Sequence, residues 1–192
     1  SPCKRRNRSG LASGSAATLA AFSLAAPGGR IVCSADCYHG TAKQLRGLLA
    51  GFGISAEFVD TSDTAAVARA LETPASVLWV ETPSNPLTEV FDIAALAEVA
   101  HAGGALLAVD NCFCSPALQR PLALGADLVI HSATKYLDGQ GRVLGGAVVG
   151  RKELTEEVFK FLRTAGPSIS PFNAWVILKG LETLRISKEA QS

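Results

Sequence analysis

The sequence predicts an α/β domain built on a mostly parallel sheet with helices on both faces. Short apolar runs alternate with longer amphipathic stretches, beginning with a strand over residues 30–34, a helix over 40–51 and a strand over 55–59. Most of the expected strands are apolar at nearly every position, which is typical of parallel strands that are covered on both faces. Helices between successive strands are the pattern of a parallel sheet between two helical layers.

Length and composition indicate one substantial core. The chain has 192 residues, of which 48% are hydrophobic and 18% charged, and its formal net charge is +1. A net charge this small creates no field that attracts nucleic acid, so we expect no nucleic-acid partner. The five cysteines are odd in number and lack paired spacing. They indicate a reducing compartment such as the cytoplasm and form no zinc pattern, so no metal is expected.

Residues 9–29 carry no charged side chain and follow a basic stretch, which mimics a signal peptide or a membrane span. Serines, glycines and Pro27 interrupt this stretch, and it is rich in alanine rather than leucine. Its transfer into lipid is therefore unfavourable. We expect a buried loop and helix of a soluble protein, with no membrane partner.

Three segments follow from the pattern along the chain. Residues 1–10 are basic and polar, fit no core pattern, and are expected to be a tail or the edge of a longer sequence. Residues 11–165 hold the alternating strands and helices. Residues 166–192 are expected to contain a helix, from Pro171 to about Ser187, that leaves the sheet domain.

The remaining elements are assigned from periodicity and capping residues. Ser13 is the expected N-cap of a helix that runs to about Ala26 and stops at the Pro-Gly-Gly of residues 27–29. The first turn of such a helix can bind phosphate, although for this stretch taken alone an ordinary capped helix is the preferred interpretation. Further helices are expected over residues 63–71, 93–102 and 152–163, and further strands over 76–81, 105–110, 127–131 and 145–149.

Chemically useful side chains stand where four of the expected strands end. Tyr38 follows one strand, Glu81 and Asn85 follow another, and Asp110 ends a third. The fourth strand leads into Ser132, Thr134 and Lys135. Because ligands of parallel sheets lie beyond the carboxyl ends of the strands, these side chains are expected to meet. An amine, an acid, an aromatic ring and a phosphate-binding helix start together predict a pyridoxal phosphate site.

Several motifs carry a resemblance to a known family. They are Ser-Gly-Ser-Ala-Ala at residues 13–17, Tyr-His-Gly-Thr at 38–41, Glu-Thr-Pro-Ser-Asn-Pro at 81–86, Val-Asp-Asn at 109–111 and His-Ser-Ala-Thr-Lys-Tyr at 131–136. Residues 170–175 and 179–184 continue the match. From about Leu11 to Arg185 the chain resembles the Cys/Met-metabolism family of pyridoxal phosphate enzymes. This family includes cystathionine γ-synthase, cystathionine lyases, methionine γ-lyase and homoserine-ester sulfhydrylases.

The resemblance implies an architecture as well as a cofactor. It implies the large domain of a fold type I aminotransferase-like enzyme, with a seven-stranded sheet over residues 11–165 that binds pyridoxal 5'-phosphate. The helix within 166–192 would lead to a C-terminal domain, so the chain is expected to be truncated at both ends. In full-length form such an enzyme is expected to be a homotetramer.

Site residues are implied by their positions in the matching motifs. Lys135 would form the Schiff base and move protons, and Tyr38 would stack on the ring and assist at the leaving group. Asp110 would pair with the ring nitrogen, and Asn85 would hydrogen-bond the ring hydroxyl. Four positions would hold the phosphate: Gly14, Ser15, Ser132 and Thr134. The sequence departs from the family at Ser15, usually Met, and at Cys112 and Cys114, where Thr and a small residue are more usual.

The run over residues 135–146 resembles the sulfhydrylases that act on O-succinylhomoserine, because the lyases and cystathionine γ-synthase more often carry Gly-His where this chain has Gly139-Gln140. It implies γ-replacement, in which sulfide and O-succinylhomoserine give homocysteine. Cystathionine γ-synthase and methionine or cystathionine γ-lyase remain alternatives. So does a catalytically inactive fragment, because no position matches the arginine that grips the substrate carboxylate.

Overall fold

The computed structural model describes residues 6–186, which form a seven-stranded mixed sheet in the order β1-β7-β6-β5-β4-β2-β3. Neighbours from β6 to β3 pair in parallel, whereas β7 is antiparallel to both β6 and β1. The expected α/β class and mostly parallel sheet are therefore confirmed. The strands are β1 Arg6–Leu11, β2 Arg30–Ser34, β3 Ser55–Val59, β4 Val77–Glu81, β5 Leu106–Asp110, β6 Leu128–Ser132 and β7 Gly146–Arg151.

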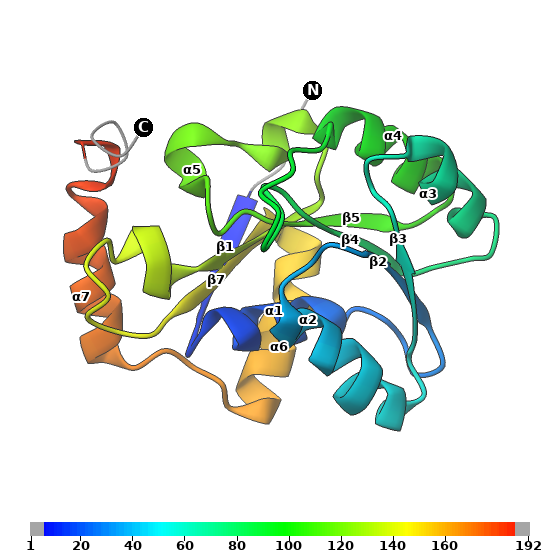
Figure 1. The fold of residues 1–192 in the computed structure, drawn as a ribbon. Helices are drawn as coiled ribbons and strands as arrows, with labels where there is room; N and C mark the ends of the chain where they lie inside the picture. Colours follow the sequence, from blue (N-terminus) through cyan, green and yellow to red (C-terminus); the bar gives the residue numbers. More distant parts are fainter. Residues whose placement is uncertain (1–5, 187–192) are drawn as a thin grey trace.

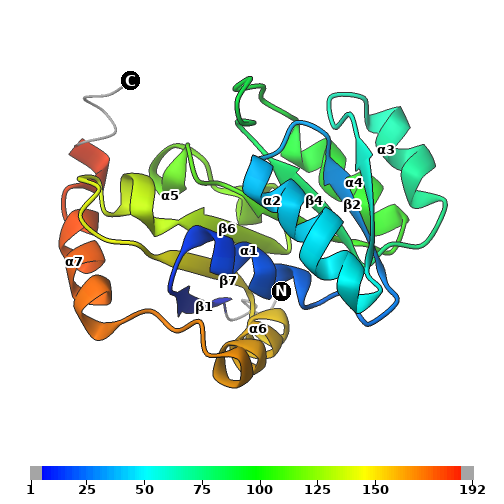
Figure 2. The ribbon, with the colours of Figure 1, turned by 60° about the horizontal axis from the view of Figure 1, so that its bottom comes forward.

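Helices cover both faces of this sheet (Figure 1). The first face carries α1, α2 and α6, and the opposite face carries α3 and α4. Helix α7 stands beyond the end of the sheet formed by β1 and β7, far from α3 (Figure 2). The helices are α1 Gly14–Phe22, α2 His39–Lys43, α3 Thr64–Leu71, α4 Ile93–Ala102, α5 Ser115–Leu118, α6 Lys152–Ala165 and α7 Pro171–Leu181. Shorter helical segments are η1 Gln44–Leu49, η2 Ala50–Phe52, η3 Pro121–Leu124 and η4 Ala133–Leu137.

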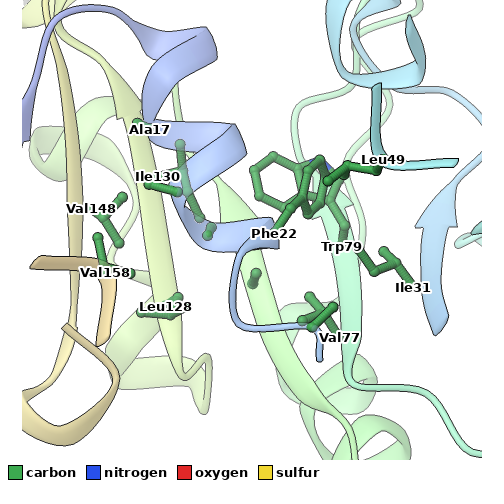
Figure 3. Packing of buried hydrophobic residues seen from close by; sticks show 14 of the residues in the cluster. Ala17, Phe22, Ile31, Leu49, Val77, Trp79, Leu128, Ile130, Val148 and Val158 are labelled. Atoms are coloured by element: carbon green, nitrogen blue, oxygen red, sulfur yellow. The ribbon is translucent and has the colours of Figure 1, made fainter. Parts of the chain in front are cut away.

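Alternate residues of β4 serve two separate cores. Trp79 packs on the α1 face, where its ring lies 4.7 Å from that of Phe22 at an interplanar angle of 54° (Figure 3). Leu78 and Val80 belong to the cluster under α3 and α4. Since successive side chains of a strand point to opposite faces, Glu81 at the end of β4 lies on the same face as Trp79.

The start of α1 is fixed by its cap and by close contact with the sheet. The Ser13 side chain accepts a hydrogen bond from the Ala16 N–H at 3.1 Å, as predicted, and a cap of this kind contributes about 1 kcal/mol. A Cβ atom added at Gly146 of β7 would lie 2.1 Å from the Ser13 carbonyl oxygen. Only glycine at this position allows the helix start to pack directly on the strand.

The prediction of a basic tail over residues 1–10 is wrong for Arg6 to Gly10, which form most of β1; residues 1–5 lie outside the described residues. This strand pairs with β7 along its whole length. Ser9 and Leu11 are buried while Arg8 and Gly10 are exposed, which is the alternation of an edge strand with one covered face. Polar composition concealed this pattern, and the sheet domain begins earlier than Leu11.

Other boundaries differ less. The expected helix over 40–51 is divided into α2, a π-helical η1 and a short η2. Helix α7 ends at Leu181, and Ser187, the expected end, lies outside the described residues. The short helix α5 and the short helical segments η3 and η4 were not predicted. Within residues 6–186 no helix is long and apolar enough to cross a membrane, and the uncharged stretch 9–29 is divided between β1, α1 and the turns after it.

Candidate active site

A cavity of about 450 Å³ opens where β4, β5 and β6 end and α1 begins. All eight side chains or backbone positions that the sequence predicts for the site line it, and none lies elsewhere. These are Gly14, Ser15, Tyr38, Asn85, Asp110, Ser132, Thr134 and Lys135.

Strand register brings the chemical groups of three strands together. Glu81 of β4 pairs directly with Asp110 of β5, and Asp110 in turn pairs with Ile130 of β6. Ser132, two residues after Ile130, therefore lies on the same face of the sheet as both acids. The carboxyl ends of these parallel strands form the floor of the cavity, as expected for an open parallel sheet.

The first turn of α1 forms one wall. A Cβ atom added at Gly14 would lie 2.7 Å from the Ser132 Cβ and 2.8 Å from its Oγ. The helix start therefore touches the serine hydroxyl, and a larger residue cannot occupy position 14 without displacement. The Thr134 Oγ1 accepts a hydrogen bond from the Gly145 N–H at 3.2 Å, which fixes a second hydroxyl nearby. Free backbone N–H groups at a helix N-terminus beside hydroxyls suit a phosphate group.

Lys135 lies close to two aromatic rings that also line the cavity. Its backbone leaves the helical region within η4, with φ −88° and ψ −111°. The Nζ atom is 4.5 Å from the centroid of the Phe113 ring and 5.9 Å from that of Tyr38. Attraction to both ring faces holds the amine in the cavity. Phe113 was not among the predicted residues, although it follows the Asp110-Asn111 motif closely enough for that motif to point to it.

Asp110 is buried, with 6% of its surface exposed. Burial raises the pKa of its carboxyl, while hydrogen bonding to Cys112 and the charge of Lys135 act in the opposite direction. The Cys112 N–H donates to the Asp110 Oδ1 at 3.1 Å, and the Cys112 Sγ accepts from the Ser132 N–H at 2.8 Å. Cys112 thus joins the acid of β5 to the backbone of Ser132 at the end of β6.

Glu81 is a second buried acid in the same cavity, and its side chain is 2% exposed. Its Oε2 accepts a hydrogen bond from the Tyr38 N–H at 2.6 Å. Burial, followed by the neighbouring charge of Asp110, raises the pKa of Glu81 to about 8. The sequence predicted that Glu81, at the end of its strand, would meet the other site residues, but gave it no role of its own.

Two loops carry the remaining predicted residues. Tyr38, whose side chain is about half exposed, immediately precedes α2, and Asn85 follows β4. Ser84 hydrogen-bonds to Asp36, and its Oγ accepts from the Glu89 N–H at 3.0 Å. The loop with Asn85 is therefore tied to the loop with Tyr38.

A larger cavity of about 760 Å³ lies elsewhere, between β6, β7, η3 and α7. Its lining is mostly apolar and includes Val129, Val149 and Ile177. His131, which also lines it, has its pKa lowered to about 4 by burial and is neutral. None of the predicted site residues lies there. Across the described residues, His, Cys, Asp and Glu form no group of three or more that could hold a metal ion.

The smaller cavity has the donor set that pyridoxal phosphate requires. The first turn of α1 with Ser132 suits a phosphate, and Lys135 supplies a primary amine. Asp110 is a buried carboxylate for a protonated ring nitrogen, and the Tyr38 ring supplies an aromatic face. All of these groups line the same cavity, so the residues present fit this cofactor.

Comparisons with known proteins agree with this fit. The profile of the family described as Cys/Met metabolism PLP-dependent enzyme matches residues 6–192. An O-succinylhomoserine sulfhydrylase from Pseudomonas aeruginosa is 57% identical over 94% of this chain and 45% of its own length. A cystathionine gamma-lyase from Bacillus subtilis is 41% identical over 94% of this chain and 48% of its own length.

Solved structures show the same similarity. The crystal structure of cystathionine gamma-lyase from Lactobacillus plantarum, complexed with L-serine, superposes with a TM-score of 0.91 at 39% identity. The match covers 93% of this chain and 47% of that chain. The sheet and its helices therefore have the fold of a fold type I domain, and the chain spans about half the length of these relatives.

Proposed function

The chain belongs to the Cys/Met metabolism PLP-dependent enzymes, and from that membership we propose that it is part of an enzyme that performs γ-replacement on an activated homoserine. The proposed substrates are O-succinylhomoserine and sulfide, and the proposed product is homocysteine. The observation that carries this proposal is one cavity in which Lys135, Asp110 and the start of α1 meet. The 57% identity to an O-succinylhomoserine sulfhydrylase supports the choice of substrate.

Pyridoxal phosphate, the cofactor of this family, supplies when bound an electron sink for negative charge on a substrate carbon. The chain's own residues would prepare and direct that chemistry. The N–H groups of Gly14 and Ser15 and the Ser132 hydroxyl would hold the phosphate. Asp110 would keep a proton on the ring nitrogen because an anionic carboxylate favours the charged ring.

Lys135 would move protons within the cavity. A γ-substituent leaves only after protons have been shifted along the substrate's carbon chain, so a base must reach successive positions. The lysine side chain is long, and its Nζ lies over the rings of both Phe113 and Tyr38. Tyr38 would stack on the cofactor ring and assist at the leaving group, and Asn85 would hydrogen-bond the ring hydroxyl.

The sequence of the loop over residues 138–142 supports the choice of substrate. Hydrogen bonds within the loop and to α7 fix its conformation. Asp138 accepts hydrogen bonds from the Arg142 N–H at 2.6 Å and from its Nε at 2.9 Å. The same guanidinium donates to the Val176 carbonyl of α7 at 3.4 Å. The loop is thereby closed on itself and tied to α7, next to Leu144 of the cavity.

A substrate comparison tests the proposal. The protein, in its full-length context and saturated with pyridoxal phosphate, is assayed with succinyl and acetyl esters of homoserine against sulfide and cysteine. We expect homocysteine from the succinyl ester and sulfide. Preference for cysteine would establish a cystathionine γ-synthase, and release of 2-oxobutyrate without a thiol would establish a γ-lyase; either result overturns the proposed reaction.

We also propose that these 192 residues alone turn over slowly or not at all. No arginine is among the residues that line the cavity, all of which belong to the described part of the chain. Without a cation to grip the substrate carboxylate, the substrate is poorly oriented, and orientation accounts for several kcal/mol of a barrier. Turnover equal to that of a full-length relative would refute this.

Compartment and assembly are further parts of the proposal. Cys33, Cys37 and Cys112 are free thiols, which supports a reducing compartment such as the cytoplasm. The proposed homotetramer rests on the family resemblance, and light scattering of the full-length protein would measure it.

A further inference from the structure

Two carboxyl groups stand side by side at the floor of the candidate site, and the proposed function uses only one. Glu81 and Asp110 are direct partners in the parallel pairing of β4 and β5. Their side chains are 2% and 6% exposed, so neither charge is solvated by bulk water. Charged or titratable groups that act on Glu81 come from three other elements: Asp110 of β5, Cys37 of the loop after β2 and Lys135 of η4.

Glu81 holds the backbone of a residue that lies across the cavity. Its Oε2 accepts the Tyr38 N–H at 2.6 Å, although the two residues are far apart in the sequence. Tyr38 immediately precedes α2, and its side chain makes no capping hydrogen bond there. The bond to Glu81 therefore anchors the segment that places the Tyr38 ring near the Lys135 amine.

When two carboxyl groups are buried this close together, ionising both is unfavourable, so the pair tends to carry one negative charge and one proton. Burial raises the pKa of both carboxyls and Lys135 acts against this at both, but Asp110 also gains hydrogen bonding from Cys112, so Asp110 is the better place for the charge. Burial and Asp110 raise the pKa of Glu81 to about 8, which places the proton on Glu81 at neutral pH. A protonated carboxyl keeps a carbonyl oxygen, so it still accepts the Tyr38 N–H.

We infer that Glu81 is a positioning residue of this site, whose carboxyl fixes the Tyr38 segment opposite Lys135 and leaves the negative charge of the acid pair on Asp110. The use of that charge by a ring nitrogen rests on the proposed function. The fixation of Tyr38 and the distribution of the charge are properties of the chain itself, and they are measured without cofactor.

Three variants separate the two roles. Glu81→Gln keeps an oxygen acceptor and is always neutral, whereas Glu81→Met has a similar volume but no strong acceptor. Glu98→Gln makes the same chemical change on an exposed residue of α4 and serves as the matched control.

The first measurement is the melting temperature of the cofactor-free chain between pH 5 and pH 9. Because the folded chain holds a proton on Glu81 up to about pH 8, against an ordinary value of 4.5, wild type loses stability as pH rises through this range. Glu81→Gln has no such loss, so its melting temperature should rise relative to wild type from pH 5 to pH 9. Glu98→Gln should show a much smaller change. If the difference in melting temperature between Glu81→Gln and wild type did not change from pH 5 to pH 9, the proton assigned to Glu81 would be wrong.

The second measurement is hydrogen exchange at the Tyr38 amide, again without cofactor. Exchange should stay slow in wild type and Glu81→Gln and become at least about tenfold faster in Glu81→Met, because that N–H loses its acceptor. Equal exchange in all three would refute the positioning role.

The third measurement links the inference to the cofactor. At pH 7 Glu81→Gln should bind pyridoxal phosphate within about twofold of wild type, and Glu81→Met about tenfold more weakly. Wild-type affinity in Glu81→Met would show that the position of Tyr38 does not serve the cofactor. Failure of wild type itself to bind would instead refute the proposed function, while the first two measurements still decide the inference.

Discussion

Just after β5 a single residue, Cys112, hydrogen-bonds with two parts of the candidate site. Its N–H donates to Asp110, and its Sγ accepts the Ser132 N–H at 2.8 Å. Burial raises the pKa of this thiol well above its ordinary value, so Cys112 is a neutral thiol here. The sequence showed only that cysteine replaces the threonine usual in the family, and the structure supplies the consequence.

Replacing Cys112 tests this connection. Cys112→Val leaves the partly buried Ser132 N–H without its sulfur acceptor, which should lower the free energy of unfolding by about 1 kcal/mol. Cys112→Thr restores an oxygen acceptor of similar size and should recover most of that loss. Denaturant unfolding of both variants measures the difference, and equal stability of Val and Thr would contradict the role of the Sγ.

Asp110→Asn tests the acid itself. The fold should survive, because the amide is nearly isosteric and burial already disfavours the charge. Activity of the full-length enzyme should fall on the order of 100-fold or more, since the ring nitrogen would lose its anionic partner. Steady-state kinetics and circular dichroism measure these effects, and normal turnover would show that Asp110 has another role.

At the scale of elements, the start of α1 is the most constrained part of the site. Gly14 touches Ser132 and Gly146 touches Ser13, so helix and sheet meet without intervening side chains. The N-cap at Ser13 was predictable because capping is a local property. Strand β1 was not, because its polar residues signal a strand only when paired with β7. The segments η3 and η4 likewise depend on neighbouring elements rather than on local periodicity.

Gly14→Ala should weaken binding of pyridoxal phosphate by about tenfold, because the new methyl group displaces the Ser132 hydroxyl from the helix start. Gly47→Ala is the matched control, since a Cβ atom at Gly47 would meet nothing within 4 Å. Cofactor titration of both variants measures the contrast. Equal affinities would show that the contact between α1 and Ser132 does not shape the phosphate site.

For the whole molecule, the sequence predicted which residues line the candidate site better than it predicted the contacts that hold those residues in place. All eight predicted residues line one cavity because parallel strands end at a common edge. Phe113 was missed, and Glu81 was expected at this edge of the sheet without a role: their contacts with Lys135 and Tyr38 join segments that lie far apart in the sequence. Such contacts follow from the packed chain, although the nearness of Phe113 to the Asp110-Asn111 motif could have pointed to that residue.

The central claim is that this cavity holds pyridoxal phosphate through Lys135, and chemical trapping tests it most directly. The cofactor-saturated protein is treated with borohydride, which makes the bond between amine and cofactor permanent, then digested and mapped by mass spectrometry. The label should lie on Lys135 and should disappear in Lys135→Arg. A label on Lys152 or Lys160, which form ion pairs on the surface of α6, would contradict the account.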